Sequence, residues 1–137
     1  MKLNLITLAL ALLGVAILVM VAPHLQWTAT RVVGAAIAGA SLALLVVARL
    51  QLGASFSIRA KAKKLVTTGL YAKIRNPIYV CGELYIIGLA LLIGRWELLL
   101  VAVALIPIQV SRARKEEKVL QQAFGEEYER YKAGTWF

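Results

Sequence analysis

Four apolar runs separated by short polar segments dominate the pattern of the chain. The first covers residues 3–22, contains no charged residue and is long enough to cross a hydrocarbon core of about 30 Å. It is longer than the apolar centre of a signal peptide, roughly 7–15 residues, so we expect a retained span. The other runs cover residues 32–49, 77–94 and 96–111. The pattern predicts an all-α integral membrane protein with four transmembrane helices in a single domain, residues 1–137.

The second run carries small residues at helical spacing, which suits close helix packing in lipid. They are Gly34, Ala35, Ala38, Gly39 and Ser41. We therefore expect this span to pack tightly against its neighbours.

The basic residues predict the orientation of the spans, because short loops rich in Lys and Arg stay cytoplasmic. Twelve of the 16 lie in the loop at residues 53–76 and the tail at residues 112–137, whereas the opposite side has only Arg31 and Arg95. The twelve are Arg59, Lys61, Lys63, Lys64, Lys73, Arg75, Arg112, Arg114, Lys115, Lys118, Arg130 and Lys132. Both termini are expected in the cytosol, with the protein in the cytoplasmic membrane.

The tail carries apolar residues at spacings of three and four, which predicts an amphipathic helix along the membrane surface. These residues are Leu120, Phe124, Tyr128 and Tyr131, and Gly125 is the expected point of interruption. Pro107, inside the fourth run, predicts a kink.

Composition supports a membrane protein. Hydrophobic residues make up 61% of the chain, charged residues 17%, and the mean hydropathy is +0.75, which excludes an ordinary water-soluble globule. The net charge of +9 is confined to the flanks of apolar runs, so it indicates lipid headgroup contacts and no nucleic acid partner. Cys81 is the only cysteine and has no companions of a metal site, so no metal is expected.

Spans three and four predict a helical hairpin, in which residues whose numbers sum to 191 share one membrane depth. Pro77 then lies level with Arg114, and Ile74 level with Glu117. The polar segments at residues 67–79 and 112–117 would form one site on the cytosolic side.

The residue types at this site suit a zwitterionic ligand. Asn76 and Pro77 are typical of a helix start, whose free N–H groups attract anions, and Arg75 strengthens that preference. Glu116 and Glu117 suit an ammonium group or hydroxyls. The alternative is a helix start at the interface and a solvated charged face. Glu83, an ionisable residue inside a span, is either functional or a packing glutamate.

The order of several short motifs resembles the isoprenylcysteine carboxyl methyltransferase and phospholipid methyltransferase superfamily. The matching segments are residues 68–71, 75–79, 82–84, 112–117 and 124–131. The resemblance implies a membrane-embedded site for S-adenosylmethionine, with no Rossmann-type domain. It implies cofactor binding by Gly69, Tyr71, Arg75, Asn76, Pro77, Tyr79, Glu116 and Glu117. Asn76 stands where the family typically has histidine, so this chain lacks a titrating ring there.

The predicted reaction is methyl transfer to a lipid-like carboxylate, thiol or amine. Arg112 or Arg114 would orient an anionic acceptor, whereas an amine would need a base such as Glu83 or Glu116. Membrane lipids are the expected surroundings, and four thin spans favour pairing of two copies. Two alternatives stay open: a non-catalytic relative acting as a subunit of a complex, and a transporter or channel subunit with Glu83 on an ion path.

Overall fold

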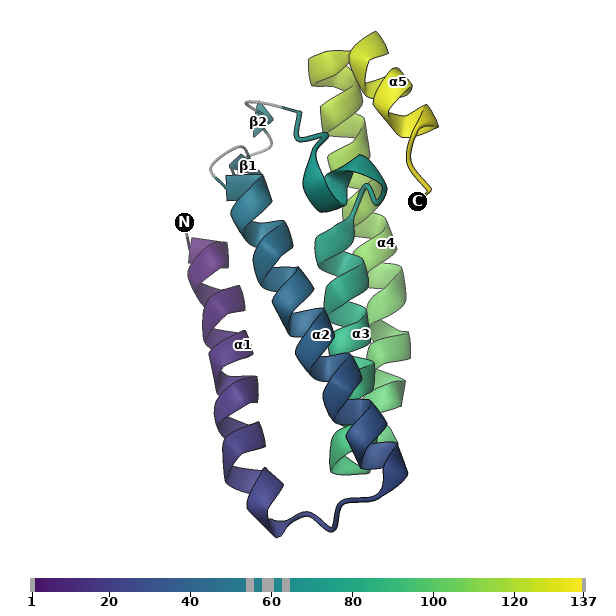
Figure 1. The fold of residues 1–137 in the computed structure, drawn as a ribbon. Coiled ribbons are helices and arrows are strands. Elements are labelled where there is room, and N and C mark those ends of the chain that lie inside the picture. The colour runs from purple at the N-terminus through teal and green to yellow at the C-terminus, as the bar shows by residue number, and fades with distance from the viewer. Residues whose placement is uncertain (1, 54–55, 58–60, 63–64, 137) are drawn as a thin grey trace.

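The four longest helices of the molecule lie side by side along one common direction (Figure 1). They are α1 (Lys2–Val21), α2 (Ala29–Leu52), α3 (Pro77–Ile93) and α4 (Glu97–Phe124), and a single turn, η1 (Ala22–His24), follows α1. The computed structural model describes residues 2–53, 56–57, 61–62 and 65–136. The predicted all-helical architecture is confirmed except for two strands of two residues each.

The start of α1 and the C-terminus lie at the same end of the bundle (Figure 1). The short strands and the last helix, α5 (Glu126–Ala133), are at this end too, and the two tight helix connections are at the other. This arrangement agrees with an even number of crossings and with the expected placement of both termini on one side. Which side faces the cytosol stays a prediction.

Helices α2 and α3 make the most extensive contact between helices in the described part of the chain. A Cβ added at Gly88 would lie 2.5 Å from the backbone nitrogen of Ala38, and one at Gly34 would lie 2.8 Å from the carbonyl oxygen of Gly88. Ser41 is also buried in this contact face of α2. The small-residue face predicted from the sequence is therefore confirmed, although Gly39 points away and has nothing within 4 Å.

Helix α3 begins at Pro77, as expected, but Asn76 does not cap it with its side chain. The carbonyl oxygen of Asn76 accepts the first helical hydrogen bonds from the amides of Tyr79 and Val80, at 3.1 and 3.3 Å. The Asn76 side chain instead lines a cavity beside the helix. The predicted helix start is confirmed, with Asn76 at the N-cap position, although the Asn76 side chain makes no capping hydrogen bond. The helix ends at Gly94, close to the predicted turn.

Helix α4 is one continuous helix of 28 residues, which corrects the expected division between a span at 96–111 and a separate surface helix. It passes through Pro107 and carries the charged segment at residues 112–117 on its last turns. The interruption expected at Gly125 is confirmed, because α4 ends there and α5 begins with Glu126.

The segment between α2 and α3 has more structure than a loop. Strands β1 (Phe56–Ser57) and β2 (Lys61–Ala62) form a small antiparallel pair, and a turn of 3-10 helix, η3 (Gly69–Ala72), precedes α3. Three of the basic residues used for the topology, Arg59, Lys63 and Lys64, lie outside the described residues.

One helix of the described chain, α2, is both long and apolar enough to cross a membrane. Shorter apolar helical stretches cover Leu12–His24 and Pro77–Ile93. Large apolar side chains are exposed on all four long helices, for example Met20 (75%), Leu50 (76%), Leu84 (42%) and Val103 (63%). Exposed apolar surface on this scale marks contact with a membrane or with another protein. The prediction of four spans is not settled by helix length and stays a prediction.

Candidate functional site

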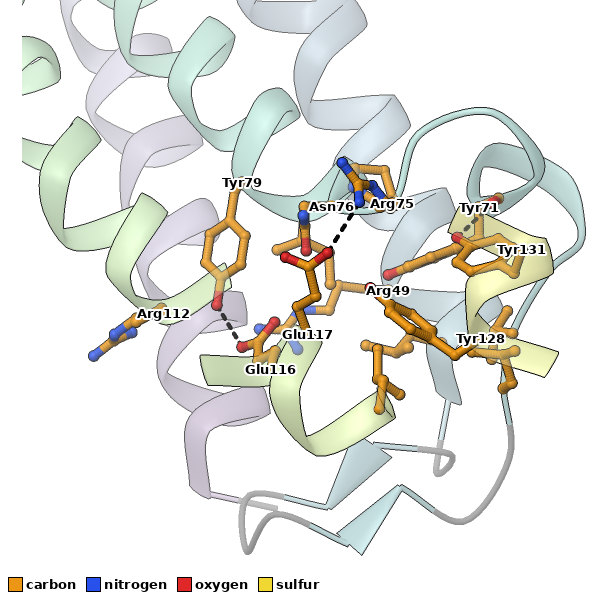
Figure 2. A pocket seen from close by; sticks show the side chains of 16 residues that line it. Arg49, Tyr71, Arg75, Asn76, Tyr79, Arg112, Glu116, Glu117, Tyr128 and Tyr131 are labelled. Atoms are coloured by element: carbon orange, nitrogen blue, oxygen red, sulfur yellow. Dashed lines mark hydrogen bonds and ion pairs between the residues drawn. The ribbon is translucent and has the colours of Figure 1, made fainter. Parts of the chain in front are cut away.

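A cavity of about 260 Å³ lies at the end of the bundle that carries η3 and α5 (Figure 2). Residues from α2, the segment before α3, the first turn of α3, the end of α4 and α5 line it together. They are Arg49, Leu52, Leu65, Val66, Tyr71, Arg75, Asn76, Pro77, Ile78, Tyr79, Arg112, Glu116, Glu117, Leu120, Tyr128 and Tyr131. Its volume is close to the lower end of small-molecule pockets, roughly 300–1,000 Å³.

Glu117 is the centre of an ion-pair network that joins three segments. Its Oε1 atom lies 3.1 Å from Nη1 of Arg75 and 2.6 Å from Nζ of Lys132. Arg75 precedes α3, Glu117 belongs to α4 and Lys132 to α5, so one carboxylate holds together three segments that are distant in the sequence. Because these side chains remain 23–41% exposed, solvent screening keeps the stability gain modest.

Glu116 on α4 accepts a hydrogen bond from a residue of α3, the other helix of the hairpin. The Tyr79 hydroxyl donates a hydrogen bond of 2.6 Å to Oε1 of Glu116 (Figure 2). Burial raises the pKa of the Glu116 carboxyl, and the Tyr79 hydrogen bond opposes that rise, as do the nearby guanidinium groups of Arg112 and Arg49. Glu116 is therefore a partly desolvated carboxylate whose charge state depends on its hydrogen-bond partner.

Helix α5 closes one side of the cavity and is tied to the segment before α3. The Tyr131 hydroxyl donates a 2.7 Å hydrogen bond to the carbonyl oxygen of Tyr71, and the amide of Trp136 donates to that of Lys73 at 2.8 Å. Tyr128 is only 2% exposed and its ring lies 6.0 Å from that of Tyr131. Burial, followed by the neighbouring Tyr128, raises the pKa of Tyr131 to about 12, so the hydroxyl keeps its proton.

Gly69 begins the turn η3, which places Tyr71 in the cavity lining. Its φ of +63° is a conformation that side-chain-bearing residues rarely adopt, and a Cβ there would collide with the side chain of Gln51. Gln51 accepts a hydrogen bond from the amide of Leu70 at 2.9 Å, which anchors η3 to the end of α2. Gly69 thus supports the site without lining the cavity.

The cavity lining includes buried polar atoms that have no hydrogen-bond partner among the described residues, for example the hydroxyl of Tyr71 and Nε of Arg75. Burial raises the pKa of the Tyr71 hydroxyl, so this group keeps its proton and can donate a hydrogen bond. Nε of Arg75 is a donor as well, because every guanidinium nitrogen carries hydrogen. Buried donors without partners are uncommon in folded proteins and call for an explanation such as a ligand. A ligand with acceptor atoms would satisfy them.

The structure brings most of the residues predicted for the site to one place. Eight of the eleven line the cavity, and the two polar segments of the hairpin meet there as expected. Arg75 pairs with Glu117 within one residue of the predicted register, whereas the partner of Tyr79, Glu116, is four residues from it. Arg114 is exposed and lines a different depression, on the outer face of α4. Glu83 lies in a groove between α3 and α4, where Nε2 of Gln109 donates a 2.8 Å hydrogen bond to its Oε2.

Several residues of the site are not predicted by the sequence. Arg49 marks the end of the second apolar run, and a lone cation at that point is the signal that places it level with the other charges. The spacing of Tyr128 and Tyr131 predicts an apolar face of the tail, but it does not predict that this face lines the cavity. Lys132, which lies outside the lining, completes the Glu117 network.

The donor and acceptor sets together fit a zwitterionic ligand with an apolar part. Arg49, Arg75 and Arg112 supply cationic donors, Glu116 and Glu117 supply acceptors, and aliphatic and aromatic side chains complete the wall. Within the described residues, no group of three or more His, Cys, Asp or Glu side chains is placed to hold a metal ion.

Comparison with known proteins identifies a family and a relative that this chain resembles. The family described as phospholipid methyltransferase matches residues 28–127, which is well over half of the chain. A protein of Schizosaccharomyces pombe (strain 972), "Protein-S-isoprenylcysteine O-methyltransferase", is 36% identical over 91 residues, covering 62% of this chain. The match covers 39% of that relative, so this chain corresponds to only a part of its length.

Proposed function

This chain belongs to the phospholipid methyltransferase family, and on that premise we propose that it is a membrane enzyme that transfers a methyl group from S-adenosylmethionine to a lipid-like acceptor. The observation that supports this most directly is the single cavity that joins the Arg75–Tyr79 segment to Glu116 and Glu117. The name of the fungal relative, an isoprenylcysteine methyltransferase, supports methyl transfer to a lipid-modified acceptor.

The cavity fits the parts of the cofactor by their chemistry. Arg75, with its unpartnered Nε, would hold the amino acid carboxylate, together with Arg49. Glu116 and Glu117 would accept hydrogen bonds from the ammonium group and the ribose hydroxyls, and Tyr71 would donate to a ring or ribose acceptor. The apolar wall would cover the adenine.

When bound, S-adenosylmethionine supplies a methyl group already activated by the positive charge on its sulfur. The residues of the chain then have to position an acceptor in line at about 3–3.5 Å and exclude water. The aromatic and aliphatic walls, with α5 held over them by Tyr131, serve the exclusion of water. Arg112, at the edge of the cavity in Figure 2, would orient an anionic headgroup.

We also propose that all four long helices cross the membrane and that the cavity opens on the cytosolic side. The exposed apolar side chains on all four helices and the shared end of the termini support this arrangement (Figure 1). The cytosol supplies the water-soluble cofactor, and lipid-facing surfaces admit an apolar acceptor. Cysteine substitutions at Thr135 and His24, labelled with a membrane-impermeant maleimide in intact and in opened cells, test the arrangement. Only the substitution at Thr135 should require opened cells.

The cofactor site is tested by calorimetry on purified full-length protein in detergent. Glu117→Gln should weaken binding of S-adenosylmethionine about tenfold or more, since a hydrogen bond to a charged group contributes about 1.5–3 kcal/mol. Glu127→Gln is the matched control, because Glu127 is exposed and lies outside the cavity lining. Equal affinities of the two variants would refute the proposed site.

A methyl-transfer assay on the wild-type protein and on Asn76→His distinguishes an active enzyme from a non-catalytic relative. The Asn76 side chain lines the cavity and makes no capping hydrogen bond to α3. If the chain is an enzyme, membranes containing it should transfer radiolabelled methyl groups from the cofactor to an extractable lipid-like product, and Asn76→His should alter the rate and its pH dependence. A relative without catalysis would give no labelled product with either residue.

A further inference from the structure

The side of α4 that faces away from the cavity carries a depression of about 400 Å³, which we call the outer depression. Pro107, Val110, Ser111, Arg114, Lys115 and Lys118 line it. They recur at spacings of three and four, so they lie along one side of the helix. Arg112, Glu116 and Glu117 lie on the opposite side and line the cavity. Helix α4 is at the edge of the bundle opposite α1 (Figure 1), so its outer side is open to the surroundings.

Three cations gather in the outer depression without an acidic partner. Arg114, Lys115 and Lys118 are exposed, and within the described residues none of them forms an ion pair and no carboxylate lines the depression. Arg114 and Lys118 are one turn apart, a spacing at which like charges repel and destabilise a helix. The helix dipole does not compensate for this, because its effect is confined to the last turn and Lys118 lies more than one turn before Phe124. An anion bound between the cations would remove the repulsion.

Apolar side chains continue the outer depression along α4 toward the N-terminus of the helix. Pro107 and Val110 line the depression, and Val103 lies one turn before Pro107 on the same side. Val103 is 63% exposed and Val110 42% exposed. A nucleic acid or an acidic peptide would match the cations but would leave this apolar track uncovered. A ligand that matches both parts has an anionic head and an aliphatic chain.

From these observations we infer that the outer depression binds one anionic phospholipid of the surrounding membrane. Its phosphate lies against the three cations, where the Ser111 hydroxyl can donate a further hydrogen bond, and an acyl chain follows Pro107 and Val103. The inference goes beyond the proposed function, because this lipid is held on the opposite side of α4 from the cavity and takes no part in methyl transfer. It depends only on the placement of α4 in the membrane.

Native mass spectrometry tests the inference on the full-length protein in detergent, mixed with equimolar phosphatidylglycerol and phosphatidylcholine. The wild-type protein should retain one phosphatidylglycerol molecule per chain in preference to phosphatidylcholine. The double variant Arg114→Gln/Lys118→Gln should bind phosphatidylglycerol about thirtyfold more weakly, because each cation beside an anionic lipid contributes about fivefold. Lys118→Arg keeps the charge and should bind as the wild type does.

Lys73→Gln/Arg130→Gln is the matched control. It removes the same charge from the same end of the molecule, and both side chains are exposed and lie outside the lining of the outer depression. This variant should retain phosphatidylglycerol as the wild type does. A second readout is the Tm, which added phosphatidylglycerol should raise in the wild type and in the control but not in Arg114→Gln/Lys118→Gln.

Equal retention of phosphatidylglycerol by the double variant and the control would overturn the inference, because general attraction to a basic protein would then be sufficient. Displacement of the lipid by an equal concentration of soluble glycerophosphate would overturn it too, since the apolar track would then contribute nothing. None of these measurements uses the cofactor or methyl transfer. Failure of the inference is therefore distinguishable from failure of the proposed function, which calorimetry of cofactor binding tests.

Discussion

The hydrogen bond between Tyr79 and Glu116 predicts how cofactor binding should depend on pH. Glu116 is placed to accept hydrogen bonds from the cofactor, and only the ionised carboxylate accepts with both oxygens. Burial raises its pKa, and the 2.6 Å bond from Tyr79 lowers it again. Tyr79→Phe removes that bond and leaves the ring in place, so the pKa of Glu116 should rise.

The size of the effect follows from the strength of the bond. A hydrogen bond to a charged group contributes about 1.5–3 kcal/mol, and 1.36 kcal/mol corresponds to one pH unit. Because Glu116 is only half-buried, water replaces part of the lost bond and the lower end applies. The midpoint below which cofactor affinity falls should move up by about one pH unit in Tyr79→Phe.

The raised pKa of Glu116 also makes the stability of the protein depend on pH. The pKa of Glu116 is raised on folding, so the native state holds its proton more tightly than the unfolded chain. The contribution of Glu116 is therefore complete below the ordinary pKa of a glutamate and is lost as the pH rises through the raised value. In Tyr79→Phe this loss should extend to higher pH.

Calorimetry of cofactor binding over a series of pH values measures the midpoint, provided that the series stays below the range of about 7.7–8.0 in which an α-amino group titrates. Tyr85→Phe is the control, because Tyr85 lies deeper in α3 and outside the cavity lining. A midpoint that is the same in Tyr79→Phe, Tyr85→Phe and wild type would show that Glu116 does not need its charge to bind the cofactor, and the assignment of its role would be wrong.

Two further predictions concern the support of the site. Gly88→Ala places a Cβ 2.5 Å from the backbone of Ala38, and this contact can be relieved only if the helices separate, so we expect the free energy of unfolding to fall by about 1–3 kcal/mol and the Tm in detergent to fall with it. Gly39→Ala adds its Cβ in open space and should not lower the Tm. Equal Tm values for the two variants would contradict the close packing. Tyr131→Phe removes the bond to the carbonyl of Tyr71, so amide hydrogen exchange in α5 should become faster, by about fivefold for about 1 kcal/mol, and an unchanged rate would show that this bond does not hold α5.

Local rules were enough to predict the helices and the relation between the two charged segments. Apolar runs predicted the helices, and Pro77 marked the start of α3. The length of the hairpin predicted Glu117 at the level of Ile74, next to its partner Arg75, because two helices of equal rise per residue keep their register. The small residues of α2 indicated a close contact, and Gly34 and Ala38 make it with α3.

Only the tertiary structure decided which side of each helix faces the site. Arg49 reaches the cavity because α2 packs on α3 with a particular rotation, and Arg114 is turned away because it lies two residues, about 200°, beyond Arg112 on α4. Pairings of this kind depend on contacts between segments far apart in the chain. The sequence by itself determined where the long helices lie and which charged segments flank them, since these follow from local periodicity. It did not determine where α4 ends, because that helix continues through the charged segment to Phe124. The meeting of Glu117 with Lys132 required the fold of α5 against η3, which no local pattern contains.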